Sequence, residues 1–402
     1  MPNIQDYVLW RGDLPIRQVP LCDVDALLLS YLSYMRYDGI VGDSFEGEGV
    51  RLADAAQELL DRNERDKMPL AYNAKEDRKL LAALIQSVRF ADMRLVGYVN
   101  QVDDKAEEQF SGVTFLIGDG SAFVAFRGTD DAMVGWKEDF NMSFEMQVPA
   151  QRDAVTYVEK ASAALRCPLR VGGHSKGGNL AAYAGMFVSD ETREYIQTVY
   201  NFDGPGFNEA TISSPDFGKV DMRVRTFVPQ CSMVGILMWH REPFTIVRSD
   251  GVGVFQHDAY TWQIMGGSFL TLRERTGHSH FADNTIKHWL EELTPDMRRQ
   301  VIDGIYSVLC ASEGKNVREL FEARNAMSVL KAMDEKTKTA VLEAFRLLGA
   351  AMIEGVPAWI ERTASNVAQK MPQRPAREGL LSRIKNAQSE QEEKQEHAPD
   401  NG

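Results

Sequence analysis

Residues 169–182 read LRVGGHSKGGNLAA, and this stretch is the strongest indication of the fold class. Residues 169–173 form a short apolar strand, and residues 179–188 have the pattern of a helix. Between them lies Gly173-His174-Ser175-Lys176-Gly177, a G-x-S-x-G sequence. A serine on a sharp turn between a strand and a helix presents its hydroxyl at the edge of a sheet, and glycines flank it because larger side chains would collide there. The stretch therefore predicts a nucleophile elbow with Ser175 as the nucleophile.

Two alternatives to an elbow apply to this glycine-rich stretch. The chain contains 31 glycines, so a G-x-S-x-G sequence can arise by chance in an ordinary loop. A phosphate-binding loop is the second alternative, but its spacing is G-x-x-x-x-G-K-[ST], which this stretch lacks. A strand before Ser175 and a helix after it are the context that an elbow requires, so the elbow is the favoured interpretation.

Strands and helices alternate along most of the chain. This alternation favours an α/β fold with a mostly parallel central sheet flanked by helices. Asp119-Gly120 has the composition of a hairpin turn between two of the strands. The predicted helices are 23–37, 51–63, 74–90 and 150–165, and the predicted strands beside 169–173 are 94–99, 114–117, 122–126, 198–202, 224–228, 244–247 and 252–255.

Composition excludes several classes of protein. The 402 residues carry a formal net charge of −13, which argues against nucleic-acid binding because that depends on Lys and Arg neutralising phosphates. The four cysteines contain no CxxC pair, so a zinc site or a disulfide framework is not expected. The N-terminus lacks the pattern of a secretory signal and no segment is long and apolar enough to cross a bilayer, so we expect a cytoplasmic protein.

A second candidate element precedes the elbow, where residues 125–130 (AFRGTD) end an apolar strand. An elbow-type site takes one oxyanion donor from the backbone N–H after the nucleophile, here Lys176. The other donor comes from a loop after an earlier strand, and the backbone N–H of Thr129 meets this requirement. The alternative for Arg127 and Thr129 is an ordinary strand-ending turn.

Several short motifs give the chain a family resemblance. FRGT at 126–129, Trp136 and Asp139 downstream, and GHSxGG at 173–178 resemble the class-three lipases. The chain also resembles an uncharacterised bacterial family, called Mbeg-like, which is related to those lipases and carries a domain-of-unknown-function label. This second resemblance is carried by DYVLWRGD at 6–13, LSYLSY at 29–34, GWKEDF at 135–140, HSKGGN at 174–179, YNFDGPG at 200–206 and QHDxxxW at 256–262. The resemblance implies the α/β-hydrolase fold and leaves the substrate open.

Seven histidines could supply the general base that a serine nucleophile requires. His174 lies inside the elbow and is interpreted as structural, while two others fall in a late helix and the tail (His288 and His397). His257 directly follows the predicted strand 252–255, and a strand-end loop is where a base can reach the elbow. In the class-three lipases the catalytic histidine lies in a comparable late loop, with an aromatic residue that Tyr260 and Trp262 resemble. His257 is therefore favoured, and the alternatives left open are His240, His278 and His280.

The acid of the site departs from the lipase pattern. In those lipases the acid lies in the loop after the strand that matches residues 224–228. Residues 229–234 (PQCSMV) contain no acidic side chain, and Ser232 stands where an aspartate is expected. The predicted replacement is Asp203, because it ends the preceding strand at the same edge of the sheet and keeps the order Ser, Asp, His.

Each candidate acid also has a reason not to be the acid of the site. Asp203 has the composition to cap the turn at 204–206 instead. Asp250 lies in a Ser-Asp-Gly turn, which it can serve without any catalytic role. Asp258 is adjacent to His257, so its side chain is poorly directed for orienting that imidazole.

The chain divides into three regions by composition. Residues 1–282 are predicted to form the α/β-hydrolase domain with its N-terminal helices, residues 283–371 a helical C-terminal region, and residues 372–402 a disordered polar tail. Within the helical region, residues 341–360 are apolar enough to cap the site or to contact a membrane surface peripherally, and both remain open.

The favoured function is a serine hydrolase that cleaves a small-molecule or lipid acyl ester, with no metal or organic cofactor. Ser175 attacks, His257 moves the proton, Asp203 orients the imidazole, and Thr129 and Lys176 hold the oxyanion. One alternative is a non-catalytic binding or scaffold protein, which the missing acid at Ser232 supports. Another is a thioesterase, peptidase or acyltransferase that uses the same serine, because one triad serves them all.

Overall fold

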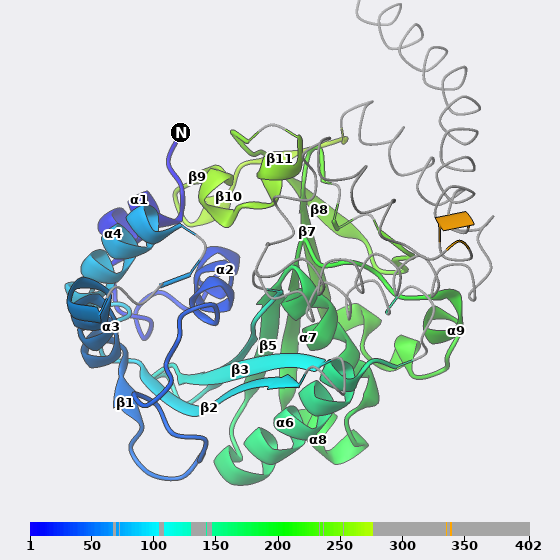
Figure 1. Cartoon of the computed structure of the whole chain (residues 1–402), viewed down its shortest axis with the longest axis horizontal. Coiled ribbons are helices and arrows are strands. Elements are labelled where there is room, and N and C mark those ends of the chain that lie inside the picture. Colours follow the sequence, from blue (N-terminus) through cyan, green and yellow to red (C-terminus); the bar gives the residue numbers. More distant parts are fainter. Residues whose placement is uncertain are drawn as a thin grey trace, which may run out of the picture. The chain divides into compact units, whose positions relative to one another are not determined.

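A mixed sheet runs through the part of the chain that the structure describes (Figure 1). This computed structural model describes residues 1–66, 70–71, 73–103, 108–129, 142, 147–232, 234–235, 237–251, 253–275, 335 and 338–339. The predicted helical region 283–371, apart from residues 335, 338 and 339, and the predicted tail 372–402 lie outside the described residues. The same holds for Trp136, Asp139, His278 and His280.

The order of the nine strands in the described sheet is β1-β2-β3-β4-β5-β6-β7-β8-β11. Strands β4 to β8 run parallel, and antiparallel strands complete both edges, so the predicted α/β architecture is confirmed. A separate antiparallel pair joins β9 to β10. The strands are β1 (Val50–Arg51), β2 (Arg94–Asp103), β3 (Glu108–Leu116), β4 (Ala122–Phe126), β5 (Leu169–His174), β6 (Ile196–Phe202), β7 (Val224–Pro229), β8 (Phe244–Val247), β9 (Ile264–Met265), β10 (Ser268–Phe269) and β11 (Thr271–Leu272).

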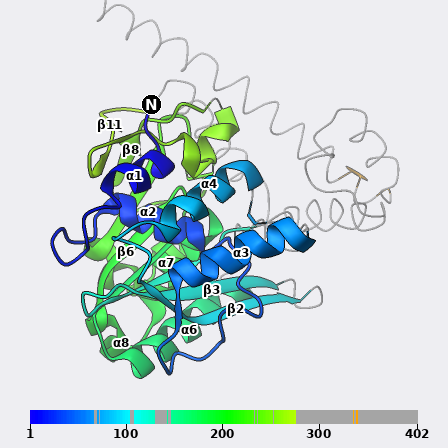
Figure 2. The same cartoon turned by 90° about the vertical axis from the view of Figure 1, so that its left-hand side faces the viewer.

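Alternating side chains of the central strands pack into two separate cores. On β4, Phe123 and Ala125 join a core with the N-terminal helices, whereas Val124 and Phe126 join a second core with α6 (Pro149–Leu165) and α7 (Lys176–Phe187). Successive residues of a strand point to opposite faces, so a strand buried on both faces has to be apolar throughout. Figures 1 and 2 show the N-terminal helices and α6 to α8 on opposite sides of the sheet.

The N-terminal helices are α1 (Ile4–Arg11), α2 (Asp23–Leu32), α3 (Leu52–Asp66) and α4 (Ala74–Ile85). A buried ion pair links α2 to the segment after α4, because the Arg89 guanidinium contacts both carboxylate oxygens of Asp25, the third residue of α2. The Tyr7 hydroxyl of α1 also donates to Asp25, at 2.8 Å. A buried charge pair is tolerated only when its remaining donors are satisfied, and Arg89 donates further to the carbonyls of Leu14, Val19 and Pro20.

The remaining helices are α8 (Asp190–Tyr195) and α9 (Glu209–Ile212), with 3₁₀ helices η1 (Phe217–Lys219), η2 (Asp221–Arg223), η3 (Gly253–His257) and η4 (Ala259–Thr261). None of the helices among the described residues is both long and apolar enough to span a bilayer.

The predicted strand 252–255 is wrong. Residues Gly253–His257 form the 3₁₀ helix η3, and the edge neighbour of β8 is β11 instead. The segment is folded into a tight loop because Trp262 Nε1 donates to the Gln256 carbonyl at 2.9 Å. A short apolar run alone does not distinguish a strand from such a loop, since the closing contact comes from a residue outside the run.

Candidate active site

Ser175 occupies a strained turn between β5 and α7. Its backbone has φ 58° and ψ −135°, a left-handed φ that L-residues rarely adopt. The turn is held because Ser175 N donates to the Phe202 carbonyl of β6 at 2.9 Å, and Gly178 N donates to the Ser175 carbonyl at 2.8 Å. Ser175 is half-buried and directly follows the central strand β5. This geometry is that of a nucleophile elbow.

The glycine two residues after Ser175 is required by close packing. A Cβ atom at Gly177 would lie 2.1 Å from the Phe126 carbonyl oxygen at the end of β4. That oxygen belongs to the backbone of a fully buried strand, so it cannot move aside cheaply. Gly177 thus lets the first turn of α7 approach β4, which brings the predicted oxyanion segment to the elbow.

The segment that follows β4 lies directly beside Ser175. A Cβ atom at Gly128 would lie 2.9 Å from Ser175 Cβ, so the backbone at Gly128 passes close to Ser175. Thr129 comes next and is buried. Lys176 is the first residue of α7, and its buried side chain donates from Nζ to the Gln109 carbonyl of β3 at 3.0 Å. Its backbone N–H lies at the positive end of a 12-residue helix, which favours developing negative charge.

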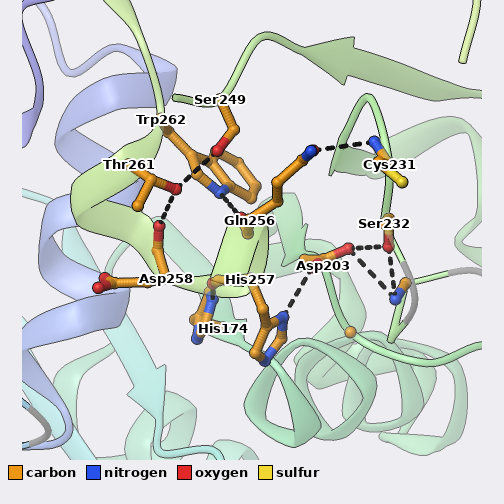
Figure 3. A network of polar contacts seen from close by, with 12 residues as sticks. His174, Asp203, Cys231, Ser232, Ser249, Gln256, His257, Asp258, Thr261 and Trp262 are labelled. Carbon is orange, nitrogen blue, oxygen red and sulfur yellow. Dashed lines mark hydrogen bonds and ion pairs between the residues drawn. The ribbon is translucent and has the colours of Figure 1, made fainter. Parts of the chain in front are cut away.

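Asp203 and His257 form a hydrogen-bonded pair (Figure 3). His257 Nδ1 lies 2.7 Å from Asp203 Oδ2, although 54 positions separate the two residues. The Asp203 side chain is fully buried, whereas that of His257 is 25% exposed. Because Nδ1 is occupied by the carboxylate, Nε2 is the ring nitrogen that remains for exchange with a substrate or a nucleophile. The structure thus brings together the two side chains that the sequence analysis selects as acid and base.

The other carboxylate oxygen of Asp203 is held by the loop after β7. Ser232 Oγ donates to Asp203 Oδ1 at 2.5 Å, and Gly235 N donates to the same oxygen at 3.2 Å. A buried carboxylate is stable only when donors surround it, and here three donors do so. Ser232 stands where the lipase pattern places the acid, and in this chain its hydroxyl donates to Asp203, which follows the neighbouring strand.

The segment that carries His257 is closed by side chains on both sides. Gln256 Oε1 accepts from Cys231 N at 2.9 Å, which ties this segment to the loop after β7. Trp262 is fully buried and closes the other end through its indole N–H to the Gln256 carbonyl. The motif Q-H-D-x-x-x-W thus encodes a closed loop that fixes His257 (Figure 3).

A buried aspartate anchors the residues just after His257. The hydroxyls of Tyr260 and Tyr31 donate to Asp77 Oδ1 at 2.8 and 2.9 Å. Asp77 Oδ2 accepts from two backbone N–H groups of the N-terminal helical part, those of Ala71 and Asn73. Burial raises the pKa of Asp77, while the tyrosine hydroxyls oppose that rise. The His257 segment is therefore attached to the N-terminal helices.

His174 contacts the candidate base directly, and the sequence pattern does not predict this contact. His174 Nε2 lies 2.7 Å from the His257 carbonyl oxygen, and the two imidazole centroids are 4.5 Å apart. A carbonyl oxygen only accepts, so Nε2 carries a hydrogen. Burial, and then the nearby His257, hold the pKa of His174 well below its usual range, so the ring is neutral. A histidine inside the elbow is the one sequence signal that could indicate this contact.

The other described candidates are engaged elsewhere. Asp250 pairs with the N-terminal amine of Met1 at 3.3 Å, and Asp258 accepts from Tyr260 N at 2.9 Å. His240 Nδ1 contacts Glu242 Oε1 at 3.1 Å. Among the described residues, Ser175 Oγ and His257 share no hydrogen bond, and no group of three or more His, Cys, Asp or Glu side chains is arranged to hold a metal ion.

The central parallel strands with a strained serine at the end of β5 define an α/β-hydrolase fold. The chain belongs to the Mbeg1-like family, whose model matches residues 84–307. A search of curated proteins finds no significant match.

The solved structures that resemble the chain include three lipases. Lipase II from Rhizopus niveus is 14% identical, with 49% of this chain and 77% of that chain covered at a TM-score of 0.33. The Rhizomucor miehei lipase propeptide complex is 12% identical (49% and 66% covered, TM-score 0.30), and the M37 lipase is 14% identical (52% and 66% covered, TM-score 0.30). At such identities a fold can be shared without a function, so function has to be derived from this chain's own side chains.

Proposed function

We propose that the chain is a serine hydrolase that cleaves carboxylic esters through an acyl-enzyme on Ser175. The observation that carries the proposal is the 2.7 Å hydrogen bond between Asp203 and His257, beside a serine on a strained elbow. The chain holds another carboxylate–imidazole pair, His240 with Glu242, but both of its side chains are buried (8% and 2% exposed). The His257 side chain is 25% exposed instead, which supports its assignment as the base that a substrate can reach.

In the proposed reaction, His257 Nε2 takes the proton of Ser175 Oγ while that oxygen attacks the ester carbonyl carbon. The carbonyl oxygen becomes an oxyanion, which accepts hydrogen bonds from the backbone N–H groups of Lys176 and Thr129. The intermediate collapses as the C–O bond breaks, and His257 returns its proton to the leaving alcohol. Water, deprotonated by the same Nε2, then attacks the acyl-enzyme and releases the acid and Ser175.

Asp203 serves this reaction through the imidazole. Its Oδ2 accepts the Nδ1 hydrogen, so Nε2 is left free to accept the serine proton. The same carboxylate stabilises the imidazolium that forms. The proposed reaction requires His257 Nε2 to be within hydrogen-bonding distance of Ser175 Oγ. Such catalytic contacts are often long before substrate binds and shorten in the complex.

A fluorophosphonate probe tests the proposal, because an activated serine displaces fluoride from phosphorus and keeps the phosphonyl group. We expect the wild type to be labelled and Ser175→Ala to be inert, and peptide mapping to place the label on Ser175. Hydrolysis of short p-nitrophenyl esters should fall by about 10³-fold or more in the same variant.

Ser213→Ala is a matched control, because Ser213 is an exposed serine that caps the end of α9. We expect it to be labelled like the wild type. Absence of labelling in the wild type, or equal labelling of Ser175→Ala, would refute the proposal and favour a non-catalytic role.

A further inference from the structure

Tyr34 lies just beyond the end of α2, in the N-terminal part that precedes the residues 84–307 matched by the family model. Its side chain is buried, and its hydroxyl reaches the elbow. A Cβ atom at Gly128 would lie 2.1 Å from Tyr34 Oη and 2.9 Å from Ser175 Cβ. The hydroxyl therefore meets the segment after β4 and the nucleophile turn at one point.

Hydrogen bonds connect this hydroxyl to His257 through the side chain of His174. Tyr34 Oη lies 3.1 Å from His174 Nδ1 and 3.2 Å from the His174 carbonyl oxygen. His174 Nε2 lies 2.7 Å from the His257 carbonyl oxygen. Since Nε2 carries the hydrogen that the His257 carbonyl accepts, Nδ1 of the neutral ring is an acceptor. The single hydroxyl hydrogen of Tyr34 is therefore shared between Nδ1 and the carbonyl oxygen of His174.

We propose that Tyr34 and His174 are positioning residues. They hold the backbone of His257, and through it the imidazole, where Nε2 can take the proton of Ser175 Oγ. The proposal rests on the serine hydrolase function above. It makes the turn after α2 a part of the active site, although neither residue touches the substrate. The tilted packing of the two imidazoles, 34° between their planes, adds a second restraint on the His257 ring.

The test compares hydroxyl deletions at two buried tyrosines of the same segment. Tyr34→Phe keeps the ring and loses the hydrogen bond to His174. Tyr37→Phe is the matched control, because Tyr37 is fully buried and its hydroxyl donates only locally, to the Leu32 carbonyl at 3.1 Å. We expect Tyr34→Phe to lower the fluorophosphonate inactivation rate constant kinact about tenfold with KI unchanged, and Tyr37→Phe to leave both within about twofold.

A second pair of variants tests His174 itself. His174→Ala removes the donor to the His257 carbonyl, whereas His174→Gln keeps an amide N–H near the position of Nε2. We expect His174→Ala to lower kinact at least as much as Tyr34→Phe, and His174→Gln to recover most of that loss. The unfolding midpoint of each variant is measured in parallel. A loss of kinact that does not follow the midpoint indicates a positioning role and not a loss of stability.

The possible outcomes are distinct. Equal kinact values for Tyr34→Phe and Tyr37→Phe, or for the two His174 variants, overturn the positioning role. So does a loss of kinact that follows the unfolding midpoint across all four variants. If the wild type is not labelled at all, the proposed function fails and the positioning role fails with it, whereas a labelled wild type with an unaffected Tyr34→Phe refutes the positioning role alone.

Discussion

The elbow and the acid–base pair are built in opposite ways. The elbow is local, since residues 173–178 supply the serine, the glycines and the start of α7 in one short stretch. The pair is assembled from distant segments: Asp203 ends β6, Ser232 follows β7, and His257 lies in a 3₁₀ helix beyond β8. Local geometry therefore positions Ser175, whereas the packing of three chain segments positions the imidazole of His257.

The ends of β6 and β7 show what this difference allows. Asp203 has φ 52°, and its carboxylate contacts His257 Nδ1 at 2.7 Å. Ser232 lies on the neighbouring loop and donates to that carboxylate. In this chain the carboxylate that contacts His257 thus comes from the end of β6, and one donor to it comes from the loop after β7.

The largest expected effect comes from a variant that disrupts only the pair of Asp203 and His257. Asp203→Asn preserves shape, but Ser232 and Gly235 keep the amide oxygen, so the amide nitrogen faces His257 Nδ1. A donor there forces the hydrogen onto Nε2, which can no longer accept the serine proton. We expect kcat for an activated ester to fall by about 10⁴-fold with little change in KM.

Ser232→Ala is the control for this prediction. It removes one donor to Asp203 while Gly235 N and His257 remain, so we expect only about a tenfold loss. If Ser232→Ala costs as much activity as Asp203→Asn, the acid does not reside at Asp203 alone.

The next largest effect is expected from a variant that disrupts the elbow instead. Gly177→Ala would place a Cβ atom 2.1 Å from the Phe126 carbonyl, so α7 and β4 must separate. We expect the free energy of unfolding to drop by about 3–5 kcal/mol, measured by urea titration followed by circular dichroism. Gly218→Ala is the matched control, because nothing lies within 4 Å of a Cβ atom there, and it should change stability by less than about 1 kcal/mol. Equal losses in both variants would contradict the role of close packing at Gly177.

The same contrast separates what a sequence can predict from what it cannot. The elbow and the central strands follow from local patterns, and Asp203 follows from the rule that parallel strands end at one edge. The contact of Tyr34 with His174 spans 140 positions and has no local pattern, since a tyrosine after an apolar helix is usually a core residue. The apolar run before His257 predicts a strand, and that prediction is wrong because the closing contact, from Trp262, lies outside the run.

The smallest expected effect is a pH dependence of stability from His174, where elbow and base meet. Burial, and then the nearby His257, hold the pKa of His174 well below its usual value of 6.5 in the folded protein. The unfolded chain therefore binds a proton near pH 6.5 that the folded protein does not bind. Stability from this group is fully present above pH 6.5 and is lost as the pH falls below it.

His174→Gln isolates this contribution, because glutamine has no proton to bind. Between pH 7.5 and pH 5.5, the free energy of unfolding of the wild type should fall by about 1.4 kcal/mol more than that of the variant, measured by urea titration at both pH values. Taking the difference between the two proteins cancels the titration of all other groups that they share. Parallel curves would mean that His174 becomes protonated in the folded state as readily as in the unfolded chain, and its neutral ring could then no longer explain how Tyr34 donates to Nδ1.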